Sequence, residues 1–260
     1  MSVIKLAHTE VGSGKPIVLL HGYPFNRSMW REQVEALSGD YRVITPDLRG
    51  HGETSVAHDT TSVAEMARDV AALLDELRIE RAIIGGLSMG GYVAFSFYSL
   101  FRERVQALIL ADTRPQSDTE EAARNREQQA EKILKEGMET IADDFLKKVL
   151  TPATIGERPE IVARVRSMIT STKPAGAAAA LRAMASRPDQ TKLLPEINVP
   201  ALIIVGSEDT LTTPKDAELM ARSIPDSRLK IIEAAAHLSN MERPAEFTNA
   251  LKSFLSDLPS

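Results

Sequence analysis

The clearest candidate for chemistry in the chain is a serine flanked by glycines, Gly86-Leu87-Ser88-Met89-Gly90. An apolar run, AIIGGL, leads into it and a helical pattern, YVAFSFYSL, follows it, which is typical of a strand–turn–helix that exposes a nucleophile. A serine at so tight a turn has a strained backbone, and glycines two positions away avoid collisions with it. We therefore predict that Ser88 is a nucleophile and that the Met89 N–H, at the helix start, faces the developing oxyanion.

A serine hydroxyl is a poor nucleophile near pH 7 and needs a general base. The five histidines of the chain are His8, His21, His51, His58 and His237. His237 comes just after the last β-rich run, so we expect it at the same edge of the sheet as Ser88, and the alanines before it leave room for the imidazole. His51, in a turn after an earlier strand, is the alternative base.

The base in turn needs an acid that orients it and stabilises the imidazolium. Asp209 follows the apolar run ALIIVG, which places it at the carboxyl end of a strand and on the same rim as Ser88. Asp112, after QALILA, is the rival, because some serine hydrolases carry the acid one strand earlier. The alternative for Asp209 is a purely structural role, as the cap of a helix that begins near Pro214.

A second turn follows the run PIVLL and reads His21-Gly22-Tyr23-Pro24. Gly22 allows the turn and Pro24 stiffens its exit, so the Tyr23 N–H is a second predicted oxyanion donor. The His21 side chain is interpreted as a buried turn residue that shapes the loop.

The elements that must position these residues are short apolar runs alternating with helical patterns. The expected strands are Ile4–Val11, Ile17–Leu20, Arg42–Thr45, Ala82–Leu87, Val105–Leu110, Ala201–Val205 and Leu229–Ile232. Several are apolar throughout, which indicates strands covered on both faces. Helices are expected at Ser62–Leu77, with Ser62 and Glu65 as a capping box, and from about Pro244. The alternation predicts an α/β fold with a mainly parallel sheet of seven or eight strands flanked by helices.

Residues 115–195 break this alternation, because the stretch contains helical patterns and no convincing strand. The expected helices are Glu120–Glu136, Glu139–Leu150, Glu160–Thr170 and Ala175–Arg187. We interpret the segment as a helical cap inserted into a core of residues 1–114 and 196–260. Within it, Arg182 and Arg187 are predicted to meet a substrate carboxylate, and Trp30 of the core is a predicted pocket wall.

The composition excludes several classes of protein. The 260 residues include no cysteine, which rules out disulfides, thiolate nucleophiles and cysteine-ligated metal centres. The net charge of −5 does not favour nucleic acid or an anionic membrane. No apolar run is long enough to cross a bilayer, and charged residues interrupt the N-terminal stretch MSVIKLAHTE. We expect a soluble cytoplasmic protein that needs no metal or cofactor and has a small-molecule substrate.

The order Ser88, Asp209, His237, together with HGYP, DLRGHGETS and GLSMGG, resembles the α/β-hydrolase fold superfamily. The segments VGSEDTLTTP and AAAHLSNMERPAEF are most similar to its cofactor-free branch of carboxylesterases, 3-oxoadipate enol-lactonases and non-haem haloperoxidase-like perhydrolases. This resemblance implies a Ser-His-Asp triad with the Tyr23 and Met89 amides as the oxyanion hole. Serine at position 88 argues against haloalkane dehalogenases and epoxide hydrolases, which have aspartate there.

The predicted function is hydrolysis of a small carboxylic ester or lactone through an acyl-enzyme. The same triad would also serve a perhydrolase, thioesterase, acyltransferase or C–C bond hydrolase, because fold and site class do not determine the substrate. A ligand receptor or partner-binding module that retains the triad is the alternative from a different class.

Overall fold

The computed structural model describes residues 3–55 and 61–258 of the chain. Its seven strands form one sheet in the order β1-β3-β2-β4-β5-β6-β7, with β1 antiparallel to β3 and every other pair parallel. The strands are β1 (His8–Val11), β2 (Lys15–Leu20), β3 (Tyr41–Pro46), β4 (Ala82–Leu87), β5 (Val105–Ala111), β6 (Ala201–Gly206) and β7 (Ser227–Ile232). The predicted α/β class and mainly parallel sheet are confirmed.

The first strand is shorter than the sequence pattern indicates. The N–H of Ile4 donates to the Asp69 carboxylate and the N–H of Ala7 to the Thr54 hydroxyl. These residues therefore satisfy their backbone through side chains of other segments, and β1 begins only at His8. The stretch before Lys15 accordingly contributes one strand to the sheet.

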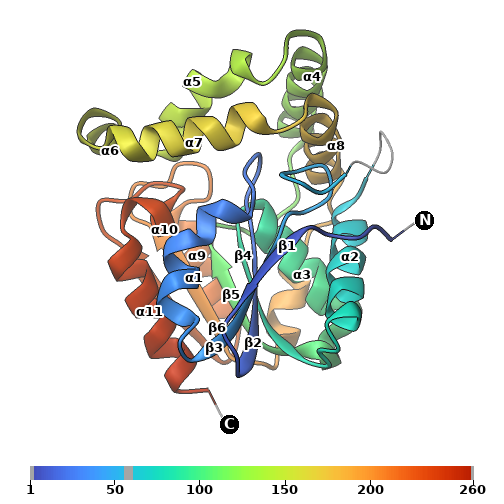
Figure 1. Ribbon diagram of the computed structural model, residues 1–260, viewed down its shortest axis with the longest axis vertical. Coiled ribbons are helices and arrows are strands. Elements are labelled where there is room, and N and C mark those ends of the chain that lie inside the picture. The colour runs from blue at the N-terminus through green and yellow to red at the C-terminus, as the bar shows by residue number, and fades with distance from the viewer. Residues whose placement is uncertain (1–2, 56–60, 259–260) are drawn as a thin grey trace.

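Helices flank the sheet (Figure 1). Outside residues 115–195 they are α1 (Arg31–Leu37), α2 (Val63–Glu76), α3 (Met89–Phe101), α9 (Pro214–Ser223), α10 (Ser239–Glu242) and α11 (Pro244–Ser256). α1 packs on α11, and α2 packs on α3. The hydroxyl of Ser62 accepts from the N–H of Glu65 and caps α2, which is half of the predicted capping box. The Glu65 carboxylate accepts from the Ser62 hydroxyl, where a full box has the Ser62 N–H as the donor. The helix α11 begins at Pro244, as predicted. No helix within the described ranges is long and apolar enough to cross a membrane.

Five helices and no strand occur between Glu120 and Ala185, in what we call the helical segment. They are α4 (Glu120–Glu136), α5 (Glu139–Val149), α6 (Pro152–Glu157), α7 (Pro159–Ser171) and α8 (Pro174–Ala185). α6 was not expected from the sequence. Figure 1 shows the segment lying across one end of the sheet. Since it follows β5, that end is the one where the parallel strands finish.

Loops at the carboxyl ends of three strands contact this segment. The Thr172 hydroxyl donates to the Pro24 carbonyl in the loop after β2, at 2.7 Å. The N–H of Leu238, after β7, donates to the Val149 carbonyl at 3.1 Å. The contacts hold the helices over the strand ends, where functional side chains of an open α/β sheet gather.

The third attachment is a contact between two glycines. Gly50, after β3, has a φ of +79°, and Gly176 lies in the first turn of α8. A Cβ built on Gly176 would lie 1.9 Å from the Gly50 carbonyl oxygen, a distance at which atoms overlap. The two backbones therefore approach as closely as they do only because neither residue has a side chain.

We expect Gly176→Ala to lower the free energy of unfolding by about 1–3 kcal/mol, because the added methyl group overpacks this contact. Intrinsic helix propensity alone would favour alanine by up to about 1 kcal/mol, so the sign of the change is informative. Gly156→Ala is the matched control, since nothing lies within 4 Å of a Cβ there. Urea denaturation of both variants measures the difference, and a stabilising Gly176→Ala would contradict the contact.

Candidate active site

Ser88 lies at a strained turn between β4 and α3, with φ +54° and ψ −112°. The turn is held on both sides, because the Ser88 N–H donates to the Ala111 carbonyl at 3.0 Å and the Thr113 hydroxyl donates to the Ser88 carbonyl at 2.9 Å. A Cβ on Gly86 would lie 2.1 Å from the Gly90 carbonyl oxygen. The two glycines of the motif thus permit a backbone that a larger residue at 86 would prevent.

The His21–Pro24 loop packs directly against this turn. A Cβ on Gly22 would lie 3.3 Å from the Leu87 carbonyl oxygen, and one on Gly90 would lie 2.9 Å from that of His21. Met89 is the first residue of α3, where backbone N–H groups have no partner within the helix. The two amides predicted to form an oxyanion hole, those of Tyr23 and Met89, therefore belong to segments in contact.

His21 is a buried residue of the loop, as the sequence indicated. Its Nδ1 lies 2.8 Å from the Gly22 carbonyl oxygen, and its Nε2 accepts from the Leu48 N–H at 2.9 Å. Both nitrogens are thus occupied by the backbone in the neutral form. Burial lowers the pKa of His21 to about 4, so the ring is uncharged near neutrality.

His51, the alternative base, packs its ring 6.2 Å from that of Tyr23 and is buried. Its Nδ1 lies 3.1 Å from the Arg49 carbonyl oxygen, and burial, with the neighbouring His21, lowers its pKa to about 3. His51 does not belong to the cavity that contains Ser88. Of the other histidines, His8 is in β1, and His58 lies outside the described residues.

The structure brings Asp209 and His237 together. The His237 Nδ1 lies 2.7 Å from the Asp209 Oδ2, and both side chains are almost fully buried. Asp209 Oδ1 accepts from the N–H groups of Leu211 and Thr212, and Oδ2 accepts from the Thr212 hydroxyl at 2.7 Å. The helix after Pro214 is capped by Thr213 instead, in a capping box with Asp216, so Asp209 is not needed as a cap.

The two groups stabilise each other's charged form. Burial opposes ionisation of Asp209, but the charge of His237 and the hydrogen bonds to the carboxylate outweigh it and lower the pKa of Asp209. Burial likewise opposes protonation of His237, yet the Asp209 carboxylate raises the pKa of this histidine above its ordinary value of 6.5. This arrangement is the one that an imidazole base requires from an orienting acid.

Asp112, the rival acid, lies nearby but faces other partners. Its Oδ1 accepts from the Gly206 N–H at 2.9 Å and its Oδ2 from the Ser239 hydroxyl at 2.5 Å. Complete burial, together with the negative charge of Asp209, raises the pKa of Asp112 well above its ordinary value. The structure thus provides one ionised carboxylate in hydrogen-bond contact with His237, and it belongs to Asp209.

Ser88 and His237 line one cavity of about 210 Å³ beneath the helical segment. Its described lining residues are Tyr23, Ser88, Tyr92, Arg114, Arg126, Gln129, Phe145, Lys148, Leu181, Met184, Leu211, Thr212 and His237. A volume of this size admits only a small molecule. Within the described ranges, no group of three or more His, Asp or Glu side chains is placed to hold a metal ion.

Three residues predicted to bind substrate are not among the described lining residues of this cavity. Trp30 is fully buried against Phe247, so it belongs to the core. Arg182 pairs with Glu127, and Arg187 is buried in a network around Asp118. The sequence placed both arginines on a helix ending at Arg187, but α8 ends at Ala185 and Arg187 follows it. Periodicity also could not tell which face of α8 meets the sheet.

The cations that do line the cavity are Arg114, Arg126 and Lys148, which sequence reasoning missed. Arg114 follows β5 at the carboxyl edge of the sheet, and that position is the one signal that could have singled it out. Arg126 and Lys148 lie in α4 and α5, two helices whose polar patterns look like ordinary solvent-exposed faces.

Comparison with known proteins places this geometry in a family. Residues 15–244 match the model of the α/β hydrolase fold family, and the chain belongs to that family. It is 32% identical over 230 residues to 3-oxoadipate enol-lactonase 2 of Acinetobacter baylyi, covering 88% of this chain and 84% of that protein.

Two solved structures are closely similar. A thermophilic esterase from Thermogutta terrifontis, determined with malate bound, superposes with a TM-score of 0.97 and 42% identity, covering 99% of this chain and 95% of that one. The enol-lactonase from Burkholderia xenovorans LB400 gives a TM-score of 0.92 and 30% identity, covering 98% and 99%. These relatives support a hydrolase that acts on an ester or a lactone.

The contact between Asp209 and His237 predicts a characteristic titration. In the unaltered protein the His237 ring should titrate above pH 6.5, because Asp209 outweighs burial. In Asp209→Asn burial remains without the compensating charge, so the pKa should fall below 6.5. NMR of the ring protons measures both values. Asp112→Asn should leave the pKa above 6.5, and an equal fall in the two variants would contradict the assignment.

Proposed function

We propose that the protein hydrolyses a small carboxylic ester or lactone on a triad of Ser88, His237 and Asp209. The observation that carries the proposal is the 2.7 Å contact from His237 Nδ1 to Asp209, in a histidine that shares its cavity with Ser88. The contact assigns the Nδ1 proton to the Asp209 side, which leaves Nε2 as the basic nitrogen. The esterase and enol-lactonase relatives support both substrate types.

In the first half of the reaction Ser88 Oγ attacks the substrate carbonyl carbon while His237 Nε2 takes the hydroxyl proton. The carbonyl oxygen becomes an oxyanion that accepts hydrogen bonds from the Tyr23 and Met89 amides. The carbon–oxygen bond to the leaving alkoxide then breaks, and His237 returns the proton to it. The products are an alcohol and an acyl-Ser88; for a lactone the alcohol stays attached to the acyl group.

In the second half a water molecule replaces the alcohol. His237 removes a proton from the water as its oxygen attacks the acyl carbon, and the same amides stabilise the second oxyanion. Collapse of the intermediate breaks the bond to Ser88, which recovers the proton from His237. Asp209 stays ionised throughout, because the charge on His237 and the hydrogen bonds to the carboxylate hold its pKa low.

We further propose that residues 115–195 act as a cap on a catalytic core of residues 1–114 and 196–260. Phe145, Leu181 and Met184 of the helical segment line the Ser88 cavity. Side chains of this segment therefore surround the position that a substrate would take above Ser88, so they are expected to select among substrates.

A fluorophosphonate should label the protein at Ser88, because the adjacent base activates that hydroxyl. Mass spectrometry of the intact protein and its peptides locates the adduct. Ser88→Ala should remain unlabelled and should no longer hydrolyse p-nitrophenyl acetate. Ser96→Ala is the control: Ser96 lies in α3, the helix that follows the turn, and this variant should behave like the unaltered protein. Labelling at another serine would contradict the proposal, and an unaltered protein without turnover would favour a ligand-binding module.

Asp209→Asn should lower kcat by roughly 10³–10⁴-fold, because the imidazole loses its orientation and the stabilisation of its charge. Activity needs neutral His237, so the rate of the unaltered protein falls as the pH drops through the raised pKa of that residue. The residual activity of Asp209→Asn should fall only at lower pH, because the pKa of His237 is lower in that variant. Rate profiles of Asp209→Asn and Asp112→Asn decide between the two acids, and a larger loss in Asp112→Asn would overturn the choice.

A further inference from the structure

The wall of the Ser88 cavity carries an excess of positive charge. Among its described lining residues three are cationic, Arg114, Arg126 and Lys148, and none is acidic. Lys148 is exposed, but the two arginine side chains are only 29% and 23% exposed. Partly buried cations that outnumber the opposing charges are unfavourable, so a cavity of this kind binds an anion better than a neutral molecule.

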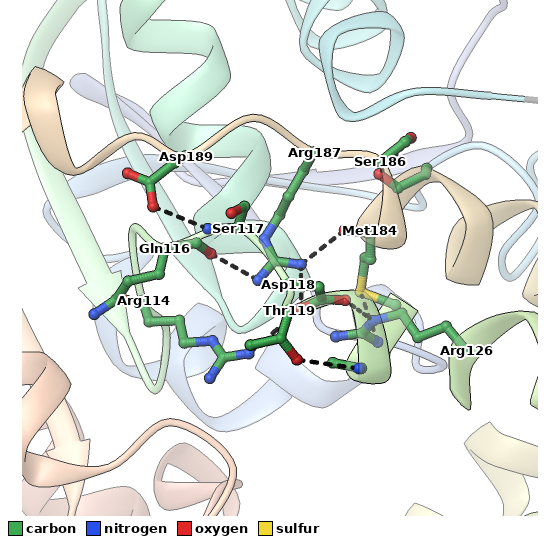
Figure 2. Close-up of polar contacts among 12 residues, drawn as sticks. Arg114, Gln116, Ser117, Asp118, Thr119, Arg126, Met184, Ser186, Arg187 and Asp189 are labelled. Carbon is green, nitrogen blue, oxygen red and sulfur yellow. Dashed lines mark hydrogen bonds and ion pairs between the residues drawn. The ribbon is translucent and has the colours of Figure 1, made fainter. Parts of the chain in front are cut away.

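Arg114 and Arg126 belong to a cluster built around Asp118 (Figure 2). The side chain of Asp118 has no exposed surface; its Oδ2 accepts from Arg126 Nε at 2.5 Å, and its Oδ1 accepts from Arg187 Nη1 at 2.7 Å. Arg114 Nη2 lies 3.4 Å from Oδ1. Burial opposes ionisation of Asp118, but the guanidinium groups outweigh it and lower the pKa of this residue. One negative charge is thus shared among three positive charges.

Arg187 has a structural role in this cluster. Its Nη1 also donates to the Met184 carbonyl at 2.7 Å and its Nη2 to the Gln116 carbonyl at 2.8 Å. Its guanidinium carbon lies 4.1 Å from the centre of the Tyr92 ring. With these contacts Arg187 fixes the position of Asp118 and does not reach the Ser88 cavity.

The other two arginines retain N–H groups without a strong acceptor. Arg126 places Nε on Asp118, and its Nη1 has only the Met184 sulfur, at 3.7 Å, which is a weak acceptor. The buried Nε of Arg114 has no hydrogen-bond partner in the described part of the chain. Arg114 is also close enough to His237 to oppose its protonation. Two guanidinium groups with vacant donors therefore line the cavity that contains the proposed base.

We propose that Arg114 and Arg126 bind a carboxylate carried by the ester or lactone substrate, and that Asp118 positions both. The inference rests on the proposed function, because it concerns the same cavity. Planar guanidinium groups match the geometry of a carboxylate and pair with it through charge-assisted hydrogen bonds. A neutral ester of the same length leaves these donors without an acceptor, so the site discriminates against it.

The test compares monoethyl glutarate with ethyl pentanoate, two ethyl esters of five-carbon acids of which only the first carries a carboxylate. Release of ethanol gives kcat/KM for each. The unaltered protein should prefer the glutarate ester, and Arg126→Gln should reduce the ratio of the two values by roughly 10–100-fold, mainly through KM for the anionic ester. Arg126→Lys keeps the charge without the planar group, so its ratio should lie between those of the unaltered protein and Arg126→Gln.

Arg124→Gln is the matched control for Arg126→Gln. Arg124 lies on the same helix, is exposed and pairs with Glu120, so its loss changes the net charge equally without touching the cavity. The ratio should stay within about twofold of the unaltered protein. Asp118→Asn should lower the ratio by releasing the arginines, and thermal unfolding shows whether that buried variant is folded.

The outcomes separate this inference from the proposed function. If Ser88→Ala abolishes hydrolysis of both esters while Arg126→Gln leaves the ratio unchanged, the carboxylate site is overturned and the hydrolase stands. The carboxylate site is also overturned if the unaltered protein prefers ethyl pentanoate, or if Arg124→Gln lowers the ratio as much as Arg126→Gln does. If Ser88→Ala retains full activity on both esters, the proposed function itself fails.

Discussion

The proposed chemistry depends on one buried hydrogen bond, between His237 Nδ1 and the Asp209 carboxylate. Burial alone would hold His237 neutral and raise the pKa of Asp209, and each group reverses this effect on the other. The two loops that carry these residues must therefore bring the two side chains within 3 Å of each other. The parallel pairing of β6 with β7 provides this, because it brings the loops that follow both strands to one edge of the sheet.

Much of the fold and of the candidate active site was predictable because local rules determine it. The central strands β4, β5 and β6 are buried on both faces and read as apolar runs, so their bounds were located closely. The edge strands β1 and β7 are mostly exposed, and they were located with less exact bounds. The turn at Ser88 depends on glycines at fixed spacing, and the positions of Asp209 and His237 follow from the strands before them. The first strand was placed too long, since the bonds from Ile4 and Ala7 to Asp69 and Thr54 join segments far apart in the sequence.

The lining of the cavity was predicted poorly for a related reason. A helix at the surface and a helix over a cavity have similar polar patterns, and only tertiary packing decides which arginine turns inward. Arg187 was expected to meet substrate, yet its contacts with Asp118 and Tyr92 make it part of the support. Arg126 lies in a helix whose sequence is polar and charged along most of its length. The cavity beside it forms only when distant segments pack together, so the sequence of the helix does not indicate it.

The contact between Gly50 and Gly176 has a consequence for how substrate preference can change. It seats the first turn of α8 against the loop after β3 through main-chain atoms alone. Leu181 and Met184, further along the same helix, line the cavity. Because this contact involves no side chain, an exchange of Leu181 or Met184 leaves the contact itself intact. One anchor of α8 is thus independent of the side chains that α8 contributes to the cavity, and under the proposed function this helix is a suitable place to redesign the substrate range.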